Sequence, residues 1–106
     1  MSDGFKEREK GFEAKWAHDE ELRFKVMAKR NKLLGLWAAG EMGLSGGAAD
    51  DYAKAVIQAE FHKAGDDDVV AKLRDDFAAK GLKYNDRAIR AKMDELLVVA
   101  GRTTKA

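Results

Sequence analysis

The side chains that could support catalysis are few in this sequence, and they stand far apart along the chain. The two histidines, His18 and His62, do not have the close spacing of metal ligands seen in motifs such as HExxH. The only serines, Ser2 and Ser45, show no arrangement with a histidine and a carboxylate that would activate a hydroxyl nucleophile. Cysteine is absent, which excludes disulfides, thiolate zinc sites and cysteine nucleophiles.

Clustered carboxylates are the remaining candidates for chemistry. The run Asp66, Asp67 and Asp68 lacks the alternating spacing and the terminal glutamate of a calcium-binding loop. Capping of a helix that begins there explains the run without any ligand. Asp75 and Asp76 fall on a predicted solvated helix, where no burial is expected that would shift a carboxyl pKa toward acid–base work. We therefore predict a binding or regulatory protein that is not an enzyme and that holds no cofactor or metal ion.

A glycine-rich stretch at residues 40–47 is the one place to look for a phosphate-binding loop. It reads GEMGLSGG, without the Lys-Ser/Thr pair of a P-loop. It also follows a predicted helix, whereas a P-loop follows a strand. We therefore interpret it as a turn between two helices.

The most distinctive segment is residues 5–16, which combines charged side chains with three aromatic ones. Phe5, Phe12 and Trp16 are spaced i, i+7, i+11, so a helix would place them on one stripe. Gly4 and Gly11 each weaken a helix by roughly 1 kcal/mol relative to alanine, and an isolated helix of about 12 residues is marginal in water. We expect this segment to be frayed alone and helical only against a partner.

Two interpretations of this segment stay open. Exposed aromatics on a charged, marginal helix are typical of a ligand that enters a groove, with the aromatics as anchors and the charges setting the orientation. The alternative is a solvated tail whose aromatic side chains dock on the rest of the chain.

Composition limits what the whole chain can be. Its 106 residues suffice for one compact domain. The 20 Lys and Arg against 19 Asp and Glu leave a net charge of +1, which argues against an electrostatically driven nucleic-acid binder. Charged residues (37%) and hydrophobic ones (45%) interleave at the short spacing of amphipathic helices, and there is no proline to interrupt a helix.

The first predicted helix spans residues 19–42. Asp19 is its candidate cap, and Gly43 fits its end. Apolar residues fall on two of its sides, one through Leu22 and Val26 and the other through Phe24 and Leu34, so we expect it to contact several neighbours. Five basic residues without an acid among them lie on this helix, as a solvated face or, alternatively, as a docking face: Arg23, Lys25, Lys29, Arg30 and Lys32.

Three shorter helices are predicted at residues 49–64, at residues 67–80, and from a cap at Asn85 to residue 100. Gly65, Gly81 and Gly101 are their expected ends, and a polar tail follows. Loops of about three to seven residues favour antiparallel neighbours. We predict an all-α fold, a four-helix bundle over residues 19–106 with a long first helix, preceded by a flexible N-terminal arm at residues 1–18.

The N-terminus MSDGFKERE has no apolar segment of the kind found in signal peptides, and no run reaches the ~18 apolar residues of a membrane span. We expect a soluble cytoplasmic protein without direct membrane insertion or nucleic-acid binding, and a monomer when free.

Several long stretches together resemble a known family. They are FKEREKGFEAKWAHDEELRFKVMAKRNKLLGLWAA at residues 5–39, GLSG at 43–46, AEFHKAGDDDVVAKLRDD at 59–76, and the late helix around 93–97. In these stretches the sequence resembles the zeta subunit, the ATPase inhibitor subunit of alphaproteobacterial F-type ATP synthases. The resemblance covers nearly the whole chain and is most specific in residues 5–39.

The resemblance implies a four-helix bundle and an inhibitor of ATP hydrolysis. In this family the N-terminal arm is held to insert as a helix at a catalytic interface of the alpha and beta subunits and to reach toward gamma. It thereby blocks rotation in the hydrolysis direction, and the protein is peripheral to the inner membrane through ATP synthase. Carried to this chain, the partner-binding residues are Phe5, Lys6, Arg8, Glu9, Lys10, Phe12, Glu13, Lys15 and Trp16. The family supplies only the segment; we expect the aromatics to anchor it and the charged residues to pair with the cleft.

Two other functions stay open. One is a nucleotide-responsive module in which the basic residues of the first helix bind ATP or ADP weakly. The other is an interaction scaffold that uses the surface of the first helix without a regulatory role.

Overall fold

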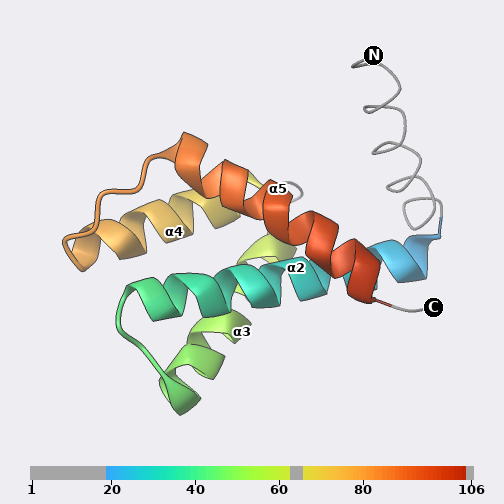
Figure 1. Cartoon of the computed structure of the whole chain (residues 1–106), viewed down its shortest axis with the longest axis horizontal. Helices are drawn as coiled ribbons and strands as arrows, with labels where there is room; N and C mark the ends of the chain where they lie inside the picture. The colour runs from blue at the N-terminus through green and yellow to red at the C-terminus, as the bar shows by residue number, and fades with distance from the viewer. Residues whose placement is uncertain (1–18, 63–65, 105–106) are drawn as a thin grey trace.

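The computed structural model describes residues 19–62 and 66–104, with the side chains of 60–62 excepted. The secondary structure of these ranges consists of helices and no strands: α2 (Glu20–Glu41), α3 (Gly46–His62), α4 (Asp67–Ala79) and α5 (Asp86–Thr103). Figure 1 shows α5 crossing in front of α2, with α3 and α4 beside them. The predicted all-α class, with four helices and a long first one, is confirmed.

Local side-chain chemistry sets where α2 and α5 begin. The Asp19 carboxylate accepts a hydrogen bond from the backbone N–H of Leu22 at 3.0 Å. The Asn85 side chain accepts one from the N–H of Ala88 at 2.8 Å. Each bond satisfies a donor that the first helical turn leaves unpaired. The caps predicted at Asp19 and Asn85 are confirmed.

Two glycines end helices in the left-handed conformation. Gly43 (φ +80°) follows α2 and Gly81 (φ +76°) follows α4. The next N–H groups turn back onto the helices: Leu44 donates to the Ala39 carbonyl and Leu82 to the Phe77 carbonyl, each at 2.8 Å. These are the bonds of a Schellman motif, which favours glycine because a Cβ is strained at positive φ.

The predicted limits of two helices were wrong. α3 begins at Gly46, three residues before the predicted start at residue 49. α5 continues through Gly101 to Thr103, although Gly101 was expected to end it. Gly101 does not adopt a positive φ, and the N–H of Thr104 still donates to the Ala100 carbonyl at 3.0 Å. A glycine weakens a helix by only about 1 kcal/mol, so packing of its neighbours can carry the helix past it.

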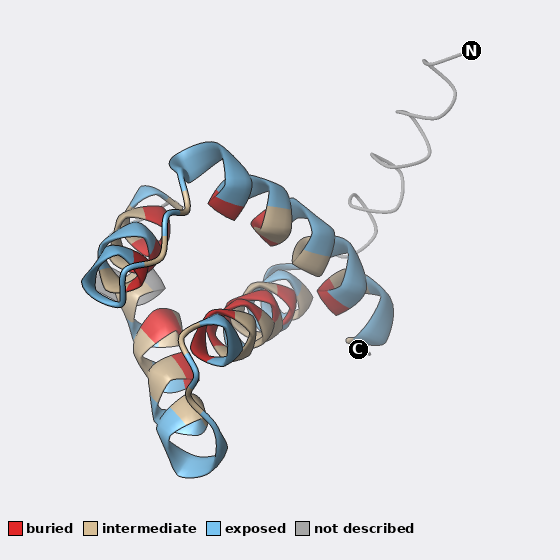
Figure 2. Cartoon of the chain, turned by 60° about the vertical axis from the view of Figure 1, so that its left-hand side comes forward, coloured by how far each residue is buried: buried red, intermediate tan, exposed pale blue. Residues whose placement is uncertain are grey.

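α2 is the central helix, and its flanks pack against α3 and α5 (Figure 2). The main core cluster draws residues from all four helices: Leu34, Ala38, Val56, Val69, Val70, Leu73, Phe77, Ile89 and Met93. A smaller cluster joins the first half of α2 to the end of α5 through Val26 and Ala100. One predicted core position was wrong, since Phe24 is 58% exposed.

α2 and α3 approach each other unusually closely at Gly35. A Cβ added to Gly35 would lie 2.6 Å from the Cα of Ala53 and 3.3 Å from the Cβ of Val56. The first distance is to backbone, which cannot move aside as a flexible side chain can. A glycine inside α2 is therefore required by the crossing of the two helices, despite its low helix propensity.

We expect Gly35→Ala to lower the free energy of unfolding by about 2 kcal/mol, because the added methyl group forces α2 and α3 apart. Thermal unfolding followed by circular dichroism measures the change. Gly40→Ala is the matched control, because a Cβ at Gly40 meets nothing within 4 Å; it should leave stability unchanged or raise it. Equal melting temperatures for the two variants would contradict the close crossing.

Candidate functional site

All nine predicted partner-binding residues, from Phe5 to Trp16, lie outside the described residues. Their predicted roles, and the division between residues 1–18 and 19–106, therefore stay predictions. The structure does describe the element that follows this segment directly, which is the first turn of α2 at Asp19 and Glu20.

The first half of α2 is held against α5 by apolar contacts. Val26 and Ala100 are fully buried, and Leu22, Leu33 and Leu97 pack around them. On α2 this cluster runs from Leu22, in the first turn, to Leu33. The beginning of α2 is therefore attached to the body of the protein.

A buried guanidinium makes the second attachment of α2. Arg30 is 2% exposed, and its terminal nitrogens donate to both carboxylate oxygens of Asp66 at 2.7 and 3.1 Å. Its Nε and one terminal nitrogen also donate to the Oδ1 of Asn31 at 3.1 and 2.9 Å. The bidentate geometry is the strong form of an ion pair, and it ties the middle of α2 to the start of α4.

This ion pair corrects two predictions. Arg30 does not lie on a solvated face of α2, as its place in the basic run suggested. Asp66 stands at the N-cap of α4 but makes no side-chain capping hydrogen bond there, because its carboxylate is bonded to Arg30. The run of acids at the start of a helix predicted that Asp66 caps this helix. Its carboxylate instead pairs with the buried Arg30, which lies 36 residues earlier in the chain.

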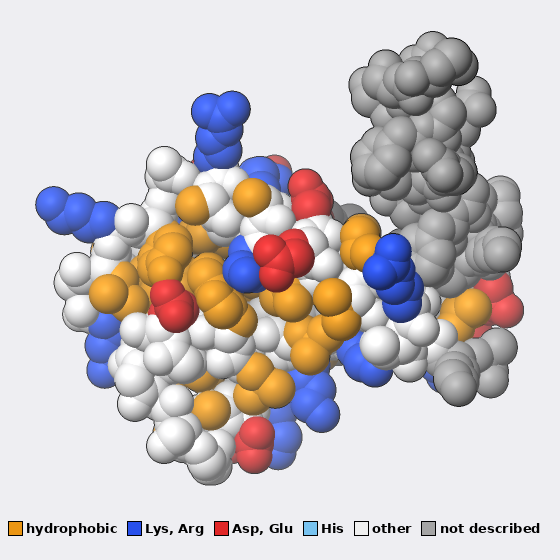
Figure 3. Space-filling model, viewed as in Figure 1, with side chains coloured by type: hydrophobic (Ala, Val, Ile, Leu, Met, Phe, Trp, Pro, Cys, Tyr) orange, Lys and Arg blue, Asp and Glu red, His pale blue; other side chains and the backbone are white. Residues whose placement is uncertain are grey.

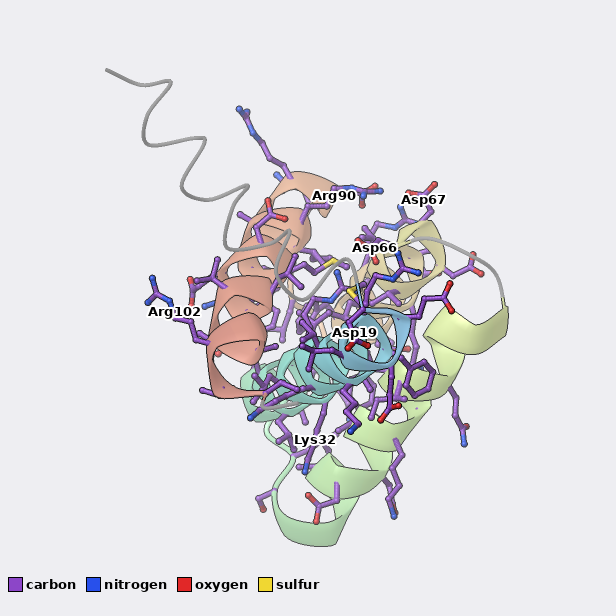
Figure 4. The ribbon with its side chains drawn as sticks, turned by 90° about the vertical axis from the view of Figure 1, so that its right-hand side faces the viewer. Asp19, Lys32, Asp66, Asp67, Arg90 and Arg102 are labelled. Carbon is purple, nitrogen blue, oxygen red and sulfur yellow. The ribbon has the colours of Figure 1, made fainter. Side chains whose placement is uncertain are left out.

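The second acid of the run pairs with another helix. Asp67 accepts a hydrogen bond from Arg90 of α5 at 2.6 Å, and Arg74 of α4 pairs with Asp86 of α5 at 3.2 Å. The Asp86 pairing raises the pKa of Arg74, and the hydrogen bond to Asp67 raises that of Arg90. Figure 4 shows Asp66 and Asp67 near the start of α4, with Arg90 on the neighbouring helix.

Metal-ligand geometry is not found in the described parts of the chain. No group of three or more His, Cys, Asp or Glu side chains is placed to hold an ion within residues 19–62 and 66–104. The acid run is bonded to arginines from two helices instead. Its role in the described structure is to join α2, α4 and α5.

The two neighbouring carboxylates on α4 point to different partners. Asp75 pairs with the adjacent Arg74 at 3.4 Å. Asp76 accepts hydrogen bonds from the hydroxyl of Tyr52 at 2.6 Å and from Lys72 at 3.0 Å. Burial raises the pKa of Tyr52 far above its ordinary value, and the bond to Asp76 adds to the rise. The hydrogen bond between Tyr52 and Asp76 therefore connects α3 to α4. Asp75 and Asp76 do not face each other as a catalytic dyad.

An aromatic cluster closes the end of the protein opposite the start of α2. Trp37, Phe77 and Tyr84 have ring centroids 4.4–5.6 Å apart, within the range of favourable ring pairs. The Tyr84 hydroxyl donates to Glu41, and Lys92 lies 5.4 Å from the centre of the Trp37 ring. Helix periodicity gave no reason to place Tyr84 beside Trp37, because Tyr84 belongs to a loop.

The five basic residues of α2 lie in different surroundings. Arg30 is buried against Asp66, Lys25 pairs with Glu21 of its own helix at 3.2 Å, and Lys32 lines a groove with α3. On the face in Figure 3, hydrophobic side chains extend across the middle, and basic and acidic side chains are scattered around and among them. The described structure therefore does not assemble the basic run into one phosphate site.

Comparison with known proteins identifies the family. The family model for ATPase inhibitor subunit zeta matches residues 1–103. The chain belongs to the ATPase inhibitor subunit zeta family. A solution NMR structure is similar to this zeta-family chain at 41% identity and a TM-score of 0.68, covering 76% of this chain and 92% of that one. No curated protein matches it.

The family description makes the coarse function plain. A zeta-family chain is an inhibitor of an ATPase and a regulatory protein, and the word subunit implies association with the ATPase it inhibits. Within the described ranges, none of the helices combines the length and the apolar character needed to cross a membrane.

We expect Asp66→Asn to lower the free energy of unfolding by about 2 kcal/mol, because it removes the negative charge that accepts hydrogen bonds from both terminal nitrogens of the buried Arg30. Losing one member of a fully buried pair costs about 3–5 kcal/mol, and the Asp66 side chain is 35% exposed, which reduces the cost. Chemical denaturation measures it. Asp68→Asn, in the same turn, should cost less than about 1 kcal/mol. Equal losses of stability in the two variants would contradict a stabilising role of the Arg30–Asp66 pair.

The Tyr52 hydroxyl predicts a change of stability at alkaline pH. Its pKa is raised in the folded state, so folding favours the protonated phenol. The contribution of the protonated hydroxyl to stability is complete below the ordinary tyrosine pKa of about 10 and is lost as the pH rises above this value.

We therefore expect Tyr52→Phe to be less stable than the original chain at pH 7 by about 1 kcal/mol, and the difference to shrink above pH 10. Denaturation at a series of pH values up to 11 tests this. A difference that stayed constant over that range would show that the hydroxyl does not resist ionisation.

Proposed function

We propose that this chain inhibits ATP hydrolysis by the catalytic head of an F-type ATP synthase. Residues 1–18 enter a catalytic interface of the alpha and beta subunits as a helix, reach gamma and block rotation in the hydrolysis direction. Residues 19–104 hold that helix in place. The chain is a monomer when free and acts on the cytoplasmic side, peripheral to the inner membrane through the synthase.

The observation that carries this proposal is the extent of the family match, which runs from residue 1 to residue 103. It includes the aromatic, charged segment as well as the four helices that follow. A helix over residues 5–16 would be about 18 Å long, enough to cross an interface between subunits. Its aromatics would supply the buried anchors that usually dominate binding energy.

The packing of the described helices supports the proposal that they hold the N-terminal helix in place. The start of α2 is fixed by the Val26–Ala100 cluster and its middle by the Arg30–Asp66 pair. A segment joined to a fixed helix loses less freedom on binding than one joined to a loose linker, which favours affinity. The core of this part is assembled from residues of all four helices.

We expect the double variant Phe5→Ala, Phe12→Ala to raise the concentration of chain needed for half-maximal inhibition of ATP hydrolysis at least 30-fold. Two lost anchors at a hot spot account for a change of this order. Steady-state hydrolysis by the purified cognate catalytic head is the measurement.

The matched control is Val98→Ala, Val99→Ala, which removes two exposed apolar side chains from α5. It should inhibit as the original chain does. If the Phe5, Phe12 variant inhibited with unchanged potency, residues 1–18 would not be the inhibitory element.

A further inference from the structure

Some basic side chains of the described helices have ion pairs and others have none. On α4 and α5, Lys72, Arg74, Arg90 and Lys92 pair with carboxylates, whereas Arg87 has no ion pair with a described residue. On the side where α2 faces α3, no ion pair of Lys32 or Lys54 is found among the described residues. Two lysines that have no ion pair with a described residue therefore lie where α2 and α3 meet.

These lysines flank a groove between the two helices. The groove has a volume of about 430 Å³ and is lined by Lys32 of α2 and by Asp50, Ala53, Lys54 and Ile57 of α3. Figure 4 shows Lys32 extending from α2 toward the side where α3 lies. The apolar lining comes from Ala53, which is buried, and Ile57, which is partly exposed.

The charges and the shape of the groove limit its occupant. Two lysines against one aspartate leave it positive, so a carboxylate-bearing partner fits it. Its charged side chains, Lys32, Lys54 and Asp50, are all exposed, so the groove is open at its rim. Small-molecule sites usually enclose 70–90% of their ligand, whereas an open groove with an apolar lining suits a protein segment.

We propose that the α2–α3 groove is a second docking surface, which binds an acidic segment of the catalytic head. This segment carries an apolar side chain between two carboxylates and inserts the apolar side chain into the groove. The identity of this partner rests on the proposed function. Lys32 and Lys54 pair with the carboxylates, and Ala53 and Ile57 receive the apolar side chain. Such charge complementarity orients a partner and speeds its association at low salt.

The test measures affinity rather than inhibition. The full chain with Lys32→Glu and Lys54→Glu is titrated into the purified catalytic head by calorimetry, at low and at physiological salt. We expect Kd to rise at least tenfold at low salt, and the difference to narrow as salt screens the charges. Lys32→Arg, Lys54→Arg should bind within about twofold of the original chain, because both charges are retained.

The matched control is Lys80→Glu, Lys83→Glu, which changes the net charge equally at two exposed lysines outside the groove. Circular dichroism establishes that each variant is folded. The proposal is overturned if the groove variant binds the catalytic head with unchanged affinity. It is also overturned if the control variant loses as much affinity as the groove variant. So does a groove variant that binds the head normally but loses binding of inorganic phosphate or self-association in sedimentation, since the occupant would then be an anion or a second copy.

Failure of this inference can be told apart from failure of the inhibitory role. A groove variant that binds weakly should still inhibit fully at saturating concentration, because residues 1–18 are intact. A chain that binds through the groove without inhibiting would contradict only the proposed function. A chain that inhibits hydrolysis while Lys32 and Lys54 contribute nothing to its affinity would contradict only the proposed docking role of the groove.

Discussion

The buried pairing of Arg30 with Asp66 is the constraint on which the arrangement of the helices depends. A guanidinium that is 2% exposed must have a counter-ion, and Asp66 supplies it from the first residue before α4. The chain must therefore return after α3 so that α4 begins against the middle of α2. This requirement joins segments 36 residues apart. Apolar packing alone is less directional and would permit more than one register.

The close crossing at Gly35 complements this ion pair. It brings α3 against one flank of α2, while the Val26–Ala100 cluster brings α5 against the other. α2 is consequently held from several sides along its length, and its N-cap residue Asp19 directly follows the segment that we propose as inhibitor. This packing is compatible with the proposed function, in which a firmly held helix follows the inhibitory segment.

Local chemistry made much of the fold predictable, and long-range packing accounts for what was missed. Asp19, Asn85, Gly43 and Gly81 act within one helical turn, so their roles follow from neighbouring residues alone. The burial of Arg30 depends on a residue in a distant segment, and no periodicity distinguishes it from the exposed Lys32. The candidate inhibitory residues were predicted from aromatic spacing and family resemblance, and they lie outside the described residues.

The central claim is that the chain blocks rotation in one direction. The most direct measurement compares ATP hydrolysis with proton-driven ATP synthesis by the same membrane-bound synthase at saturating chain. We expect hydrolysis to be largely suppressed while synthesis keeps most of its rate, because the proposed block acts only on rotation in the hydrolysis direction. Equal suppression of both reactions would contradict it.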